Sequence, residues 1–203
     1  MSTNNERFDV IAFDNIDHYS QLPPDIAEGI GNAVNSAFGG TVTVEDARDH
    51  MTGHQLLVTI EKETKEVAGF TSTVTTSPRQ RFGEPVLTDQ VGTYFAGAAI
   101  AKKFQGQGLY HIMNDQRLKF ALHNDGSNIF TQTQNPRVIE GLTDDMERMV
   151  DLGRIGKFTV STVIRQGAYG QMLTAEKPVA RNLVLDLDYD RGDAAVVTWH
   201  LER

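Results

Sequence analysis

Several residue types and patterns that would define a protein class are missing from this sequence. Its 203 residues include no cysteine, which excludes disulfide bonds, thiolate catalysis and cysteine-based zinc sites. No apolar run approaches the roughly 20 residues that a bilayer-spanning helix requires. The polar residues 1–6 lack the basic and apolar segments of a signal peptide. We therefore expect a globular protein in the cytoplasm, without a membrane partner.

Acidic residues outnumber basic residues in this sequence. There are 19 Lys and Arg against 27 Asp and Glu, for a formal net charge of −8. This balance argues against broad nucleic-acid binding, which depends on a basic surface. An acidic surface can attract a cationic amine substrate, or it can serve solubility alone.

Two common catalytic arrangements are also missing. None of the 6 histidines stands in a His-x-x-x-His or His/carboxylate ligand spacing, so we expect no metal. The Gly-x-Ser-x-Gly motif of serine hydrolases does not occur either.

A short glycine-containing loop follows a run of small apolar residues near the middle of the chain. Gly106 and Gly108 let the backbone curl and approach a ligand closely, and the loop opens a predicted helix. Helix N-termini bind anions through free N–H groups and the helix dipole, and Lys102 and Lys103 add positive charge. The loop is thus either a diphosphate cradle or an ordinary strand–turn–helix junction.

Two familiar phosphate-binding motifs do not fit this loop. A P-loop requires Lys-Ser or Lys-Thr after its last glycine, and neither follows Gly108. A dinucleotide fingerprint requires a third small residue and a downstream acidic residue that contacts the ribose, and both are missing.

The loop resembles the signature of the GNAT family of acetyl-CoA-dependent N-acyltransferases, Arg/Gln-x-x-Gly-x-Gly/Ala. Gln105 and Gly108 match its first and middle positions, whereas Tyr110 replaces the final small residue. Ile100, five residues before Gln105, and Asn135, after the following strand, also fit the family pattern.

This resemblance implies a cofactor and its contacts. Acetyl-CoA would be the acyl donor, with its pantetheine arm held by main-chain groups at Ile100, Ala98 and Lys102 of a bulged fourth strand. The apolar run around Ala98 independently leaves room for a ligand beside this strand. Asn135 also has a structural explanation, as the N-cap of the next helix. The residues predicted to contact the cofactor are Ile100, Ala101, Lys102, Gln105, Gly106, Gln107, Gly108, Leu109, Tyr110 and Asn135.

The resemblance also implies a fold. We expect an α/β (α+β) protein with a mixed, mostly antiparallel sheet, helices on both faces and a splayed fourth and fifth strand. Residues 1–203 would form a single acyltransferase domain that diverges from about residue 151.

Hydrophobic periodicity and turn residues predict the individual elements. Strands are expected at residues 8–13, 56–60, 67–75, 93–100, 129–133, 158–163, 183–187 and 194–201. Helices are expected at residues 24–38, 43–51, 108–123 and 136–150. Residues 77–90 are expected to form a loop, residues 165–173 a short helix or loop, and residues 189–193 a turn.

The implied reaction is direct transfer of an acetyl group to a primary amine, which needs a base, oxyanion donors and an acid for the departing thiolate. The family's tyrosine acid is missing from residues 136–150, and Tyr169 is the available substitute. Base candidates are Glu84, Asp89 and His54, although each also fits an ordinary surface position.

Three functions remain open on the sequence. The first is an N-acetyltransferase for a small-molecule amine or a peptide, and its divergent C-terminal part could pair two subunits as a homodimer. The second is a non-catalytic acyl-CoA-binding or regulatory module, favoured by the missing tyrosine. The third is an interaction domain in which residues 105–110 form only a turn.

Overall fold

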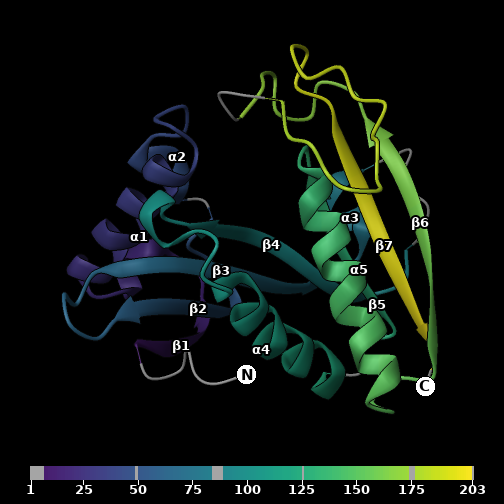
Figure 1. The fold of residues 1–203 in the computed structure, drawn as a ribbon, viewed down its shortest axis with the longest axis horizontal. Coiled ribbons are helices and arrows are strands. Elements are labelled where there is room, and N and C mark those ends of the chain that lie inside the picture. Colours follow the sequence, from purple (N-terminus) through teal and green to yellow (C-terminus); the bar gives the residue numbers. More distant parts are fainter. Residues whose placement is uncertain (1–6, 49, 84–88, 125, 174–176, 203) are drawn as a thin grey trace. The chain divides into compact units, whose positions relative to one another are not determined.

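The computed structural model describes residues 7–48, 50–83, 89–124, 126–173 and 177–202. Within them, one mixed sheet of seven strands has the order β1-β2-β3-β4-β5-β7-β6, with helices flanking it (Figure 1). The strands are β1 (Phe8–Ile16), β2 (Gly53–Glu61), β3 (Val67–Thr76), β4 (Gly92–Ile100), β5 (Asn128–Thr133), β6 (Lys157–Arg165) and β7 (Ala194–Glu202). The helices are α1 (Pro24–Ala37), α2 (Val44–Arg48), α3 (Pro78–Phe82), α4 (Leu109–His123) and α5 (Pro136–Asp151), with short 3-10 turns η2 (Tyr19–Gln21) and η3 (Lys102–Phe104).

The pairings confirm the predicted fold class. β1–β2, β2–β3, β5–β7 and β6–β7 are antiparallel, whereas β4 and β5 are parallel. In the described chain, the β4–β5 register comprises two pairs, Thr93 with Ile129 and Tyr94 with Phe130. Gly92 permits this approach, because a Cβ there would lie 2.5 Å from the Asn128 carbonyl oxygen. A ladder this short fits two strands that separate soon after they begin.

The chain divides into two compact units. The first comprises Met1–Val74 and Phe95–Gln116, and the second comprises Thr75–Tyr94 and Arg117–Arg203. β3, β4 and α4 each have residues in both units.

The core of the first unit forms between α1 and its strands. The predicted apolar stripe of α1 is buried, including Ile26, Ile30 and Val34, and belongs to one cluster with Val58 of β2 and Phe70 of β3. Burying such a side chain completely contributes roughly 1.5–3 kcal/mol. Pro24 begins α1 and Phe38 caps it before Gly39 and Gly40, as the sequence predicts.

In the second unit, Trp199 of β7 is fully buried. Its indole Nε1 donates a hydrogen bond to Thr143 Oγ1 of α5 at 3.2 Å, tying the helix to the strand. α5 begins where the sequence predicts: the Asn135 side chain accepts a hydrogen bond from the Arg137 N–H and Pro136 occupies the first turn.

Two predictions about helices are wrong. The predicted loop at residues 77–90 contains α3, because the Ser77 and Gln80 side chains form a reciprocal capping box around Pro78. The second helix ends at Arg48 and does not reach Met51, whose N–H donates a hydrogen bond to the Arg48 carbonyl three residues earlier.

The predicted strand at residues 183–187 is also wrong, since this segment has no regular secondary structure. The Glu140 carboxylate of α5 accepts hydrogen bonds from the N–H groups of Arg181, Asn182 and Leu183, in place of a neighbouring strand. The alternation of residues 183–187 therefore indicates which of their side chains are more buried, but it does not show that another strand pairs with them. Residues 166–173 form turns, so the loop alternative is correct there.

Candidate functional site

The predicted cofactor loop is an exposed bend between β4 and α4. The chain leaves β4 through η3, turns at Gly106 (φ 73°) and Gly108 (φ 76°), and enters α4 at Leu109. Both glycines occupy the left-handed region that favours glycine, and both are exposed. A Cβ at Gly106 would meet nothing within 4 Å, so the bend faces open space.

The bend presents unused backbone donors. Among the described residues, the N–H groups of Gly106, Gly108 and Leu109 have no hydrogen-bond partner, and the Ile112 N–H closes the first turn onto the Gly108 carbonyl at 3.4 Å. These N–H groups precede or begin a 15-residue helix, where the dipole favours negative charge. The bend therefore has the chemistry of an anion site.

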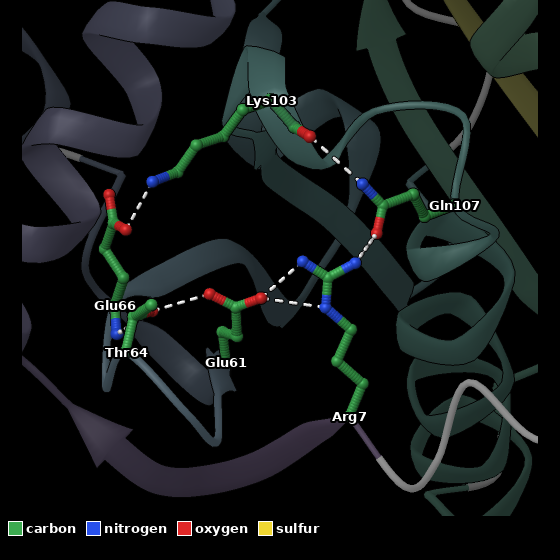
Figure 2. A network of polar contacts seen from close by, with 6 residues as sticks. All are labelled: Arg7, Glu61, Thr64, Glu66, Lys103 and Gln107. Atoms are coloured by element: carbon green, nitrogen blue, oxygen red, sulfur yellow. Dashed lines mark hydrogen bonds and ion pairs between the residues drawn. The ribbon is translucent and has the colours of Figure 1, made fainter.

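Arg7, which lies just before β1, is hydrogen-bonded to Gln107 of the bend (Figure 2). Its Nη1 donates to Gln107 Oε1 at 2.8 Å, and Gln107 Nε2 in turn donates to the Lys103 carbonyl at 3.0 Å. The Arg7 guanidinium also lies 5.7 Å from the ring centre of Phe104, which packs edge-on against Phe8. The bend is thus anchored by a side chain about 100 residues away in sequence.

Glu61 at the end of β2 orients Arg7. Its carboxylate is buried and accepts from Arg7 Nε at 2.8 Å and from Thr64 Oγ1 at 2.6 Å. The Thr64 hydrogen bond, and then the Arg7 hydrogen bond, lower the pKa of Glu61, which keeps it charged. An ion pair between Lys103 and Glu66 joins η3 to the same β2–β3 connection (Figure 2). Nothing in the local sequence indicates roles for Arg7 or Glu61, because their contacts join residues that are far apart in the chain.

The outer face of β4 is open where the pantetheine arm is expected. Ala98 is exposed, and Ala96 and Ile100 on the same face are half-buried, whereas their neighbours are buried. The Gly97 N–H donates to the Ser72 side-chain Oγ at 3.0 Å.

Two main-chain groups at this site already have partners. The Ile100 carbonyl accepts a hydrogen bond from Gln105 Nε2 at 3.0 Å, and the Lys102 N–H donates to Ser36 Oγ at 3.1 Å. A ligand that used either group would have to displace a side chain.

A groove of about 590 Å³ opens beside η3 within the first unit. It is lined by Gly29, Asn32, Ala33, Ser36, Glu66, Val67, Ala101, Lys102 and Lys103. Of the remaining predicted cofactor residues, Leu109 is buried, Tyr110 is half-buried with its ring 6.1 Å from that of His111, and Asn135 caps α5.

The candidate catalytic residues have different surroundings. Asp89 is exposed and forms an ion pair with Arg79 at 2.5 Å, and His54 is also exposed. The Tyr169 hydroxyl donates to the Gln132 carbonyl at 3.1 Å, and burial raises its pKa to about 12. Glu84 lies outside the described residues.

The described chain lacks two further features. No helix there combines the length and apolarity that crossing a bilayer demands. The same residues contain no group of three or more histidine and acidic side chains arranged to hold a metal ion.

Known proteins resemble this chain in structure but not in sequence. No protein-family model matches it, and no curated protein matches it. A protein from Desulfovibrio desulfuricans assigned to the GNAT family of acetyltransferases aligns at a TM-score of 0.50 and 17% identity, over 94% of this chain and 98% of its own. The ribosomal-protein-S18-alanine N-acetyltransferase from Escherichia coli aligns at 0.52 and 11% identity, over 95% and 94%.

A third similar structure is the NatC complex bound to Gag peptide and CoA. It aligns at a TM-score of 0.52 and 8% identity, over 95% of this chain and 97% of the matched chain. Identities this low carry the fold and not the chemistry. The sheet order, the parallel β4–β5 pair and these similarities together show that the chain has the fold of the GNAT acetyltransferases.

Proposed function

We propose that this protein transfers an acetyl group from acetyl-CoA directly to a primary amine. The observation that carries the proposal is the exposed bend before α4, where the N–H groups of Gly106, Gly108 and Leu109 have no partner among the described residues. A diphosphate is an anion that such a bend suits. The resemblance of the loop sequence to the GNAT signature and the GNAT fold support the same reading.

The residues of the first unit would bind and orient the donor. The N–H groups of Gly106 and Gly108 would donate hydrogen bonds to the diphosphate oxygens, with Lys102 close by in sequence. The open face of β4 at Ala98 and Ile100 would receive the extended arm. The proposal treats residues 1–203 as one acyltransferase domain, because β3, β4 and α4 each run through both units.

The chemical step would need no protein nucleophile. A neutral amine attacks the thioester carbonyl, its proton passes to a base or to water, and the oxyanion is stabilised by backbone N–H groups. A small-molecule amine and a peptide N-terminus both fit this reaction, and the NatC structure contains a peptide together with CoA.

The second candidate function is a non-catalytic acyl-CoA-binding module, and the surroundings of Tyr169 favour it. A phenol with a pKa of about 12 is a weaker acid than a thiol, whose ordinary pKa is about 8.5. Tyr169 would therefore protonate a departing thiolate poorly. No tyrosine occurs in α5 to replace it.

Release of free thiol from acetyl-CoA in the presence of a panel of primary amines tests the proposal. We expect thiol release that depends on both the protein and an amine, with acetylated amine detected by mass spectrometry. Binding of acetyl-CoA without any amine-dependent release would support the module instead. Absence of both would contradict both functions.

A further inference from the structure

Two arginines and three aromatic rings gather in the second unit. The Phe82 ring of α3 packs edge-on against Tyr94 of β4 at 5.2 Å, and Tyr94 stacks on Phe130 of β5 at 5.1 Å. Arg165 at the end of β6 lies 5.0 Å from the centre of the Phe82 ring, and Arg81 lies 5.5 Å from that of Tyr94. Four elements therefore bring their side chains to one place.

The two arginines have no carboxylate partner among the described residues. Arg165 Nη1 donates to the neutral Gln132 Oε1, and the charge of Arg81 lies over the Tyr94 ring. Four other arginines of this unit pair with carboxylates: Arg79 with Asp89, Arg148 with Asp145, Arg181 with Asp144 and Arg191 with Asp193. Arg137 and Arg154 instead donate to the Val179 carbonyl and to Met149 Sδ.

The electrostatics of Tyr94 agree with an uncompensated positive site. Burial is the main effect and raises the pKa of Tyr94. The charges that oppose this rise all come from arginines, namely Arg81, Arg117 and Arg165. Among the described residues, no carboxylate contributes to this shift.

The cluster is built and reachable. Arg81 is exposed, Phe82 and Arg165 are half-buried, and Tyr94 is 5% exposed. The Tyr169 hydroxyl donates a hydrogen bond to the backbone carbonyl of Gln132 in β5. The Gln132 side chain in turn accepts a hydrogen bond from Arg165 and orients it. Partly buried charges are normally paired, because taking them out of water costs free energy. A guanidinium that is held in place suits a planar carboxylate.

We propose that Arg81 and Arg165 bind a carboxylate or comparable oxyanion of the acceptor, against the rings of Phe82 and Tyr94. The acceptor would then be an amine that also carries a negative group. This inference rests on the proposed function, which places the donor along β4, the strand that carries Tyr94.

Direct binding tests the anion site without catalysis. Benzoate and its neutral isostere benzamide are titrated into the full chain by calorimetry. We expect benzoate to bind about tenfold more tightly than benzamide, as charge-assisted hydrogen bonds are stronger than neutral ones. R165Q and R81Q should each remove most of this preference. R79Q, on the same helix, should keep it because Arg79 pairs with Asp89.

Equal binding of benzoate and benzamide would overturn the inference, as would an equal loss in R79Q. R81Q guards against a folding defect in R165Q, because Arg81 is exposed, and thermal unfolding of each variant verifies its fold.

Acceptor turnover connects the site to the reaction. The pair 4-(aminomethyl)benzoate and 4-(aminomethyl)benzamide presents the same amine with and without a charge. We expect about a tenfold lower KM for the carboxylate, lost in R165Q with kcat unchanged, since the lost interaction is one of uniform binding. Equal KM values would overturn the inference and leave acetyl transfer intact. Failure of both amines would contradict the proposed function, while the benzoate titration would still decide the anion site.

Discussion

Gly69 of β3 controls how closely β4 approaches at the point where the donor arm is expected. A Cβ at Gly69 would lie 2.6 Å from the Ala99 carbonyl oxygen and 3.2 Å from Ile100 Cα. Ordinary contact begins near 3.4 Å, so G69A requires the Ala99 oxygen to move by 3.4 − 2.6, about 0.8 Å. Because the contact is with backbone, no rotamer change relieves it. Overpacking of this kind costs about 1–3 kcal/mol of unfolding free energy.

The displacement should affect function beyond stability. A misplacement of about 1 Å can cost about a hundredfold in rate, so we expect kcat/KM for acetyl-CoA in G69A to fall between tenfold and a hundredfold. At 2–4 °C for each kcal/mol in a chain of this length, Tm should fall by about 2–12 °C.

The matched control for G69A is G92A, which introduces a similar clash in the second unit. A Cβ at Gly92 would lie 2.5 Å from the Asn128 carbonyl oxygen. G92A should lower Tm by a similar amount without displacing Ile100. Thermal unfolding and thiol release measure the two effects separately. Equal losses of kcat/KM for acetyl-CoA in G69A and G92A, or an unchanged kcat/KM in G69A, would refute the reasoning.

Three further substitutions probe other contacts. R7A should weaken acetyl-CoA binding several-fold, because it releases Gln107. R48A should leave this binding unchanged, because Arg48 pairs with Glu45 and contacts the Tyr19 ring instead. Calorimetric titration of acetyl-CoA into both variants measures the difference. The pKa of Tyr169 is raised to about 12 in the folded state, so its stabilising contribution is complete below the unfolded value of about 10 and is lost as pH rises from 10 to 12. Between pH 9 and pH 11.5, the unfolding temperature should therefore fall less in Y169F than in the wild type. An equal fall in both proteins would contradict a buried environment for Tyr169. W199F should lower the free energy of unfolding by about 1–3 kcal/mol, because it removes the hydrogen bond to Thr143 and leaves a cavity. Urea unfolding followed by circular dichroism measures this loss, because the substitution removes the single tryptophan that would serve as a fluorescent probe.

The local pattern of the sequence predicted the elements that bury one apolar face. The stripe of α1, the hairpin β2–β3 and the Asn135-Pro136 start of α5 all follow from periodicity and capping residues. The two-glycine bend also lies where the motif predicts it, at the head of α4. These features depend on neighbours within a few residues.

The missed features depend on distant partners. Glu61 looked like a surface charge at a hairpin, yet it is buried because Arg7 and Thr64 satisfy its carboxylate. Arg165 and Arg81 meet only because β6 and α3 end near the same aromatic rings. The short helix α3 is different, because its capping box, Ser77-Pro78-x-Gln80, is local and visible in the sequence.

The most direct test of the central claim is calorimetric titration of acetyl-CoA into the wild type, G106A and G40A. Gly106 and Gly40 both have positive φ, at 73° and 86°, and a Cβ at either would meet nothing within 4 Å. Both variants therefore carry similar backbone strain, of about 1–2 kcal/mol, and should lose similar stability. Binding in the wild type and G40A, with at least a tenfold loss in G106A, is the predicted result. Equal affinity in all three proteins, or no binding by the wild type, would contradict a diphosphate site at the bend.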